Sequence, residues 1–178
     1  ATSCPCRERD GSGRGDGRSL GQRAVKARQV SFAGEAEESV VSLDLSVAGG
    51  HVVHLSARES PALGIASRVW PACGVLARFL AKEPSRIEGK GVVELGAGCG
   101  LLGMALDALG ASRVLLTETP RALPWLHQNV ERSGRPLDCM ALPWGERLGG
   151  LPWPCDVVVG SDLVYFEGVL EPLCLTLM

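Results

Sequence analysis

The clearest two-residue periodicity of apolar and polar side chains lies in residues 39–47, and it predicts a β-strand. Gly49 and Gly50 follow, and a pair of glycines between two such segments is typical of a tight turn. Residues 51–55 then provide a returning strand. We therefore expect an N-terminal β-hairpin extension within residues 31–63. The alternating apolar side chains of its first strand are those of Val41, Leu43, Leu45 and Val47.

From Gly64 onward the pattern changes to helical segments that alternate with short apolar strands. Such alternation produces parallel strands joined by right-handed helical crossovers. We therefore predict an α/β fold with a Rossmann-like open, mainly parallel sheet in residues 64–178. Ligands of such sheets bind at the carboxyl ends of the strands. The predicted strands are 91–95, 113–117, 137–142 and 156–160, and the predicted helices are 64–80, 102–109, 122–133 and a last one that starts near residue 167.

A glycine-rich turn joins the first of these strands to the next helix. Its three alternate glycines are Gly96, Gly98 and Gly100. Glycine adopts the left-handed dihedral angles of a sharp turn. It also removes the side chains that would block a ligand lying against the backbone. Because a plain turn needs only one glycine, three of them indicate a ligand site.

Two ligand classes compete for this turn. Residues 98–103 fit the dinucleotide pattern G-x-G-x-x-G, and Glu118 lies 20 residues beyond Gly98, where a ribose-binding acid is expected. The strand ends before Gly96, however, and Glu94 lies two residues earlier. A carboxylate there repels a pyrophosphate but attracts a sulfonium ligand that carries an ammonium group. We therefore favour S-adenosylmethionine, with a nicotinamide-dependent oxidoreductase as the alternative.

Charge and composition narrow the remaining function classes. The chain has 178 residues and a formal net charge of −2, so it has no excess of positive charge for a nucleic-acid backbone. No apolar stretch approaches the ~18 residues of a membrane-spanning helix. The seven cysteines are scattered without a C-x-x-C pair, which favours reduced thiols over a metal site. We expect no nucleic-acid, membrane or metal partner, and a cytoplasmic or nuclear location.

The two ends of the chain carry further expectations. Residues 1–30 are rich in Gly and Arg with few apolar groups, so we predict a disordered tail. An RNA-binding role for this tail is disfavoured because it lacks aromatic residues and contains acids. His51 and His54 point to opposite faces of a strand and do not form a metal site. The first residue is Ala and the last helix is short, so we expect a C-terminally truncated fragment.

Several motifs occur in the order found in one family. Residues 94–100 resemble motif I of S-adenosylmethionine methyltransferases. Residues 70–72 resemble the W-x-A element, and residues 142–145 the L-x-W-G element, of protein-lysine methyltransferases of the methyltransferase-16 type. Residues 162–165 resemble that family's acid followed three residues later by an aromatic residue. The chain is similar to this family over residues 40–177, and its helix after Glu118 carries the family's frequent Asn at residue 129.

The resemblance implies S-adenosylmethionine as the cofactor and a contact for each matched residue. An aromatic plane suits the adenine, and a carboxylate can accept hydrogen bonds from two ribose hydroxyls. The implied cofactor-binding residues are Trp70 at the methionine end, Glu94, Gly96, Ala97 and Gly98 at the glycine turn, Glu118 at the ribose, and Trp144 and Ser161 at the adenine.

The resemblance also implies that Asp162 and Tyr165 face the methyl acceptor, which is a lysine of a protein substrate. We expect them to be catalytic, orienting the ε-amine for in-line attack and accepting its hydrogen bonds. Outside the motif, Asp162 would be interpreted as an acid that caps a helix, and Tyr165 as a packing residue. A small-molecule acceptor is an alternative. We expect a monomer.

The chain departs from the family pattern in three ways. Glu118 stands where the family more often has Asp. Pro143 lies inside the L-x-W-G element, where it is expected to disturb the turn that holds the tryptophan. The family fold has seven strands, and this chain supplies about the first four. A sheet cut there exposes an edge and apolar surface, so a non-catalytic fragment is a further alternative.

Overall fold

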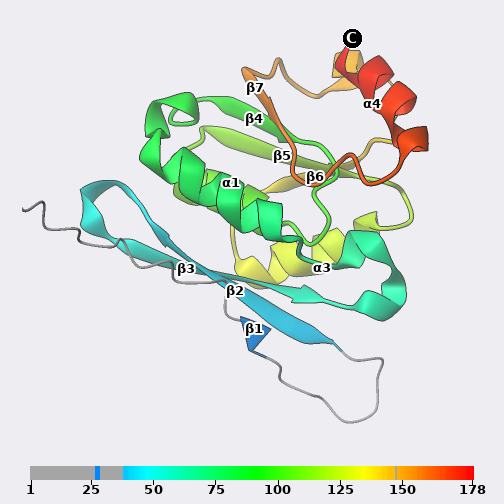
Figure 1. The fold of residues 1–178 in the computed structure, drawn as a ribbon. Helices are drawn as coiled ribbons and strands as arrows, with labels where there is room; N and C mark the ends of the chain where they lie inside the picture. The colour runs from blue at the N-terminus through cyan, green and yellow to red at the C-terminus, as the bar shows by residue number, and fades with distance from the viewer. Residues whose placement is uncertain (1–26, 29–37, 147) are drawn as a thin grey trace, which may run out of the picture.

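The structure is a computed structural model, and it describes residues 27–28, 38–146 and 148–178 (Figure 1). It contains an antiparallel sheet in the order β1-β2-β3 and a parallel sheet in the order β6-β5-β4-β7. The predicted disordered tail, residues 1–30, lies outside the described residues except for its residues 27–28. These two form the short strand β1 (Ala27–Arg28), which pairs with β2 and so differs from the expectation of disorder.

The predicted hairpin is confirmed, with β2 (Ser39–Ser46) paired along its whole length to β3 (Val52–Glu59). Its connection is longer than the expected two-residue turn. A 3₁₀ turn over Ala48–Gly50 is closed by the Val47 N–H, which donates to the His51 carbonyl at 2.9 Å. The returning strand also runs four residues beyond the predicted end at residue 55, because each added residue finds a partner on β2.

The first long helix, α1 (Pro71–Lys82), starts later than predicted. The stretch expected to be helical from residue 64 instead contains a 3₁₀ turn at Ile65–Ser67 and then extended backbone up to Trp70. The cause is Pro71, because a proline disfavours helical dihedral angles in the residue before it and is well suited to the first helical position. Residues 64–70 are therefore free to form a wall of the site described below.

The predicted Rossmann-like sheet is confirmed, with every strand pair parallel. The chain runs from β4 outward through β5 to β6, and then returns to place β7 on the other side of β4. The order of strands therefore reverses between β4 and β7, which is where open α/β sheets bind ligands. The elements are β4 (Gly91–Glu94), α2 (Leu101–Ala108), β5 (Arg113–Glu118), α3 (Leu123–Ser133), β6 (Asp138–Ala141), β7 (Val157–Val159) and α4 (Leu170–Leu177).

The hydrophobic core lies on both faces of the parallel sheet. On one face, α1, α2 and α3 separate the sheet from the hairpin, whose ribbon crosses below α1 and α3 in Figure 1. Neighbouring residues of β4 point to opposite faces: Val92 joins the core with the hairpin, and Val93 joins the smaller core with Leu173 of α4. In the described part of the chain, β7 pairs with β4 alone. Among the same residues, no helix is both long and apolar enough to cross a bilayer.

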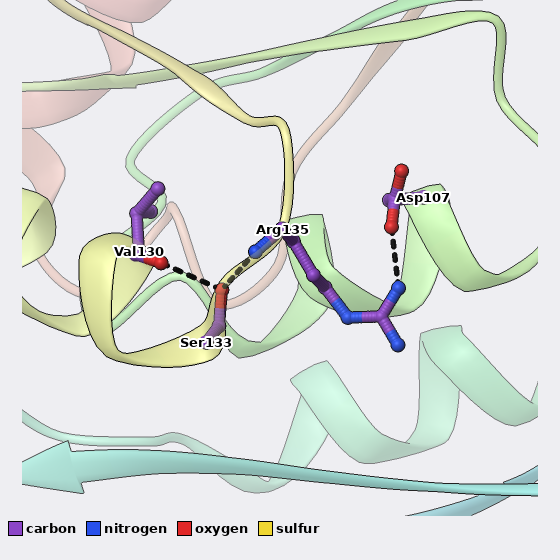
Figure 2. A network of polar contacts seen from close by, with 4 residues as sticks. All are labelled: Asp107, Val130, Ser133 and Arg135. Carbon is purple, nitrogen blue, oxygen red and sulfur yellow. Dashed lines mark hydrogen bonds and ion pairs between the residues drawn. The ribbon is translucent and has the colours of Figure 1, made fainter.

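A polar network closes the carboxyl end of α3 (Figure 2). The Ser133 hydroxyl donates to the Val130 carbonyl at 2.7 Å and accepts the Arg135 N–H at 3.2 Å. The Arg135 guanidinium then forms an ion pair with Asp107 of α2. Side chains thus bond with backbone groups at the end of this helix, and they fix the start of the connection to β6.

Asn129 joins α3 to the hairpin. Its side chain is buried, its Oδ1 accepts the Arg58 N–H at 2.9 Å, and its Nδ2 donates to the Arg58 carbonyl at 2.9 Å. One amide therefore satisfies both backbone groups of a residue in β3. The hairpin is held to the helix layer by this pair of bonds as well as by apolar packing.

We predict that Asn129→Ala lowers the free energy of unfolding by about 2–3 kcal/mol, because it leaves two backbone groups without their partner. The measurement is urea unfolding followed by circular dichroism. The neighbouring Gln128 is exposed, so Gln128→Ala is the control and should stay within about 0.5 kcal/mol of the wild type. Equal losses in the two variants would contradict this role of Asn129.

Candidate functional site

A cavity of about 410 Å³ opens at the carboxyl ends of β4, β5 and β7. Its volume lies in the range of ~300–1,000 Å³ found for small-molecule sites. Most of the predicted site residues line it, although they come from distant parts of the chain. The predicted residues that line the cavity are Trp70, Gly96, Gly98, Glu118, Trp144, Ser161, Asp162 and Tyr165.

The glycine turn forms the floor of this cavity. Gly96, Gly98 and Gly100 have φ angles of 60°, 56° and 79°, in the left-handed region that side chains disfavour. There is also no space for side chains. A Cβ on Gly96 would lie 2.9 Å from Leu163, and one on Gly98 would lie 3.2 Å from a backbone carbonyl oxygen. The bare backbone is therefore required for the turn itself and for access to it.

The Glu118 carboxylate fixes the middle of the turn. Its Oε2 accepts the Gly98 N–H at 3.0 Å, and its Oε1 accepts the Thr119 N–H at 2.8 Å. A carboxylate has about four acceptor positions, so each oxygen keeps one more for a ligand. Glu118 is buried except where it faces the cavity. Glu118 stands where the family more often has Asp, and its longer side chain accepts hydrogen bonds from both the Gly98 and the Thr119 N–H.

Glu94 and Ala97 do not line the cavity. Glu94 lies beneath the turn with its side chain fully buried, and its Oε2 has no hydrogen-bond partner. Burial raises the pKa of this carboxyl to about 8; a hydrogen bond from the Gly103 backbone opposes the rise, and the nearby Glu118 carboxylate adds to it. Ala97 is buried, and its N–H donates to the Thr117 carbonyl at 3.0 Å. In this structure both residues support the turn from behind.

Trp70 stands at the mouth of the cavity, immediately before α1. Its indole N–H donates to the Ile65 carbonyl at 3.1 Å, and the Arg68 guanidinium lies 5.6 Å from the centre of its ring. The side chain is 43% exposed. Trp70 therefore presents a ring face whose orientation is set by the preceding loop.

Trp144 also lines the cavity, from the turn that contains Pro143. The turn around this proline is closed by hydrogen bonds. The Glu146 N–H donates to the Pro143 carbonyl at 3.2 Å, and the Gly145 N–H donates to the Thr176 hydroxyl of α4 at 2.8 Å. Proline lacks an N–H, but it takes part in this turn through its carbonyl.

The loop after β7 supplies the last wall. Tyr165 is 55% exposed and lies edge to face with Phe166. Asp162 has a φ angle of 56°, the only positive φ of a non-glycine residue in the described part of the chain. Its Oδ2 accepts the Ala72 N–H of α1 at 3.1 Å. The capping interpretation of Asp162 is therefore realised, at the same time as its carboxylate lines the cavity.

Several lining residues were missed from the sequence. Ile65, Ala66 and Arg68 belong to the stretch that was predicted to be helical, although Pro71 could have signalled that the helix starts later. The remaining ones, Thr119, Pro143, Leu163 and Val164, lie beside predicted residues, and none was itself proposed as a site residue. Among the described residues, no three His, Cys, Asp or Glu side chains are grouped so as to hold a metal ion.

Comparison with known proteins adds independent information. Residues 51–178 match the model of a family described as lysine methyltransferase. The chain is 37% identical to mouse EEF1A lysine methyltransferase 3 over 136 residues, covering 70% of this chain and 58% of that protein. It is 38% identical to zebrafish protein N-lysine methyltransferase METTL21A over 133 residues, covering 71% and 60% of the two chains. The chain thus spans about three fifths of the length of these relatives.

We predict that Glu94→Gln makes the stability of the chain less dependent on pH. Between the usual value of 4.5 and the raised pKa of about 8, the folded chain keeps a proton that the unfolded chain releases. The free energy of unfolding of the wild type therefore falls as the pH rises through this window, and the loss is complete above the folded pKa. The variant cannot titrate there and should gain on the wild type as the pH rises.

Urea unfolding at several pH values across this window measures the difference. Glu131→Gln, on an exposed face of α3, is the matched control and should follow the wild type. Parallel stability profiles for the wild type and Glu94→Gln would show that Glu94 does not hold a proton in the folded chain.

Proposed function

We propose that this chain, which belongs to the lysine methyltransferase family, binds S-adenosylmethionine and transfers its methyl group to the ε-amine of a lysine in a protein. S-adenosylmethionine is the cofactor of this family. The single observation that carries the proposal is the bare left-handed glycine turn, held by a buried carboxylate, at the floor of a mainly apolar cavity.

The residues around the cavity fit this cofactor. Glu118 keeps two acceptor positions for ribose hydroxyls, and Gly96 and Gly98 let the ligand approach the backbone closely. We assign Trp144 and Ser161 to the adenine and Trp70 to the methionine end. Glu94 and Ala97, which lie behind the turn, contribute by holding its shape. The pKa of the fully buried Glu94 carboxyl is raised. A cationic ligand bound above the turn lowers this pKa, and Glu94 then becomes a carboxylate beneath the ligand.

The cofactor supplies an electrophilic methyl group on a positively charged sulfur. The protein's part is to hold a neutral amine in line with that methyl group. A lysine amine has a reference pKa near 10.4, and an apolar surrounding disfavours its charged form. The cavity mouth is apolar at Ile65, Val164 and Tyr165, so it can strip water from the incoming amine.

We assign Tyr165 and Asp162 to the acceptor side. Both lie on the loop after β7 and line the cavity, and each carries an oxygen that can accept a hydrogen bond from the amine. Alignment of two bound reactants supplies a large part of the acceleration in such transfers. The curated relatives act on EEF1A and on other proteins, which supports a protein lysine over a small-molecule acceptor.

We predict that the chain binds S-adenosylhomocysteine in a calorimetric titration and does not bind NAD. Glu118→Ala should weaken this binding by at least about tenfold, because it removes the ribose acceptors and releases the Gly98 N–H. Glu131→Ala, an exposed acid on α3, is the control and should bind as the wild type does. A folded wild-type chain that ignores S-adenosylhomocysteine at millimolar concentration would overturn the proposed function.

We predict transfer of a radiolabelled methyl group to lysine in at least one of two purified proteins, EEF1A and calmodulin, which appear in the names of two relatives of this chain. Tyr165→Phe keeps the ring but removes the hydroxyl, so it should lower turnover about tenfold or more with little change in affinity for S-adenosylhomocysteine. Unchanged turnover would remove Tyr165 from this role. Label that appears only in small metabolites would favour the small-molecule alternative.

A further inference from the structure

Helix α1 lacks an N-terminal cap of its own. Its N-cap residue is Trp70, which has no side-chain oxygen, and its first turn contains no acidic residue. Of its first N–H groups, Pro71 has none and the Cys73 N–H donates to the Trp70 carbonyl at 3.1 Å. The Ala72 N–H still needs an acceptor, since the first N–H groups of a helix have no partner within it.

Asp162 supplies this acceptor from 90 residues away, through its Oδ2 at 3.1 Å from the Ala72 nitrogen. A carboxylate is well suited to this place because the amino end of a helix carries a partial positive charge. The backbone of Asp162 is itself unusual, with φ at 56°. Asp and Asn tolerate this conformation better than most residues, and such strain persists where the surroundings impose it.

The loop around Asp162 is closely packed at Leu163, although Asp162 itself is exposed. A Cβ on Gly160 would lie 2.4 Å from the Leu163 side chain, and a Cβ on Gly96 would lie 2.9 Å from the same side chain. The loop after β7 therefore folds back on itself and onto the glycine turn. Its hydrogen bond to Ala72 links this packed loop to the first turn of α1, and thus to the adjacent Trp70.

We propose that Asp162 is a positioning residue for the cofactor: its bond to the Ala72 N–H holds the start of α1, and with it Trp70, against the methionine end of the ligand. This inference rests on the proposed function and goes beyond it. One carboxylate oxygen serves the helix, and the other remains for the acceptor amine. Asp162 thereby couples the wall that binds the cofactor to the loop that receives the substrate.

Loss of the hydrogen bond between Asp162 and Ala72 should affect binding of the methionine end of the ligand only. An Asp162 that served only the acceptor amine would leave cofactor affinity unchanged when it is removed. An Asp162 that merely stabilised the fold would weaken every ligand alike. A positioning residue acting through Trp70 should instead weaken ligands that carry the methionine end and spare those that lack it.

The test compares two ligands by calorimetry on the full chain. S-adenosylhomocysteine has the amino-acid end, and 5′-methylthioadenosine lacks it. Asp162→Ala should weaken the first about fivefold to tenfold, the size expected for loss of a helix cap, and change the second less than twofold. Asp162→Asn keeps an acceptor oxygen and tolerates the same φ, so it should restore binding of S-adenosylhomocysteine to within about threefold of the wild type.

A second pair of variants removes the donor and leaves Asp162 intact. Ala72→Pro deletes the N–H inside the first turn, although it also restricts the backbone of the preceding Pro71, and Ala72→Gly keeps the N–H. Ala72→Pro should reproduce the selective loss, Ala72→Gly should not, and the double variant Asp162→Ala with Ala72→Pro should lose no more than either alone. Hydrogen exchange at residues 72–74 and circular dichroism confirm that each variant is folded.

The outcomes separate this inference from the proposed function. A wild-type chain that binds neither ligand overturns the proposed function. A wild-type chain that binds S-adenosylhomocysteine, together with an Asp162→Ala variant that binds it equally well, overturns the positioning role alone. An equal loss for both ligands also overturns it, because the effect is then not confined to the methionine end.

Discussion

The site depends on a backbone turn that has no room for side chains and one acid that holds it. Gly96, Gly98 and Gly100 adopt left-handed angles that other residues disfavour, and a Cβ on Gly96 or Gly98 would crowd Leu163 or a backbone carbonyl oxygen. The turn would be loose if it depended on glycine alone, because glycine is also the most flexible residue. Glu118 removes that freedom by accepting the Gly98 N–H from the adjacent strand. The three glycines permit the turn, and Glu118 holds it in one conformation as the floor of the cavity.

A second carboxyl, that of Glu94, is buried under the turn, and the fold tolerates it in its neutral form. Glu94 ends the strand β4, and one of its two carboxyl oxygens, Oε2, has no hydrogen-bond partner. In its neutral form it costs less to bury than in its charged form, which is why burial raises its pKa. A cation bound above the turn would favour the charged form and so lower this pKa.

Much of this could be predicted from the sequence, because strands and glycine turns follow from local patterns. The hairpin and the parallel sheet were predicted from alternation, and eight of the ten site residues implied by the family resemblance line one cavity. What was missed depends on contacts between distant residues. Nothing near Ala72 indicates that its N–H is satisfied by Asp162, and nothing near Arg58 indicates that Asn129 binds its backbone. The late start of α1, by contrast, was visible in Pro71.

The hydrogen bond between Gly145 and Thr176 bears on the order in which the cavity forms while the chain is synthesised. The turn that carries Trp144 is tied to the hydroxyl of Thr176, which lies 31 residues after the Gly145 N–H that it accepts. Thr176 therefore has to leave the ribosome before the side of the cavity that carries Trp144 can take its final shape. The glycine turn and Glu118 emerge earlier. A nascent chain should thus expose the floor of the cavity before it can complete the wall that carries Trp144.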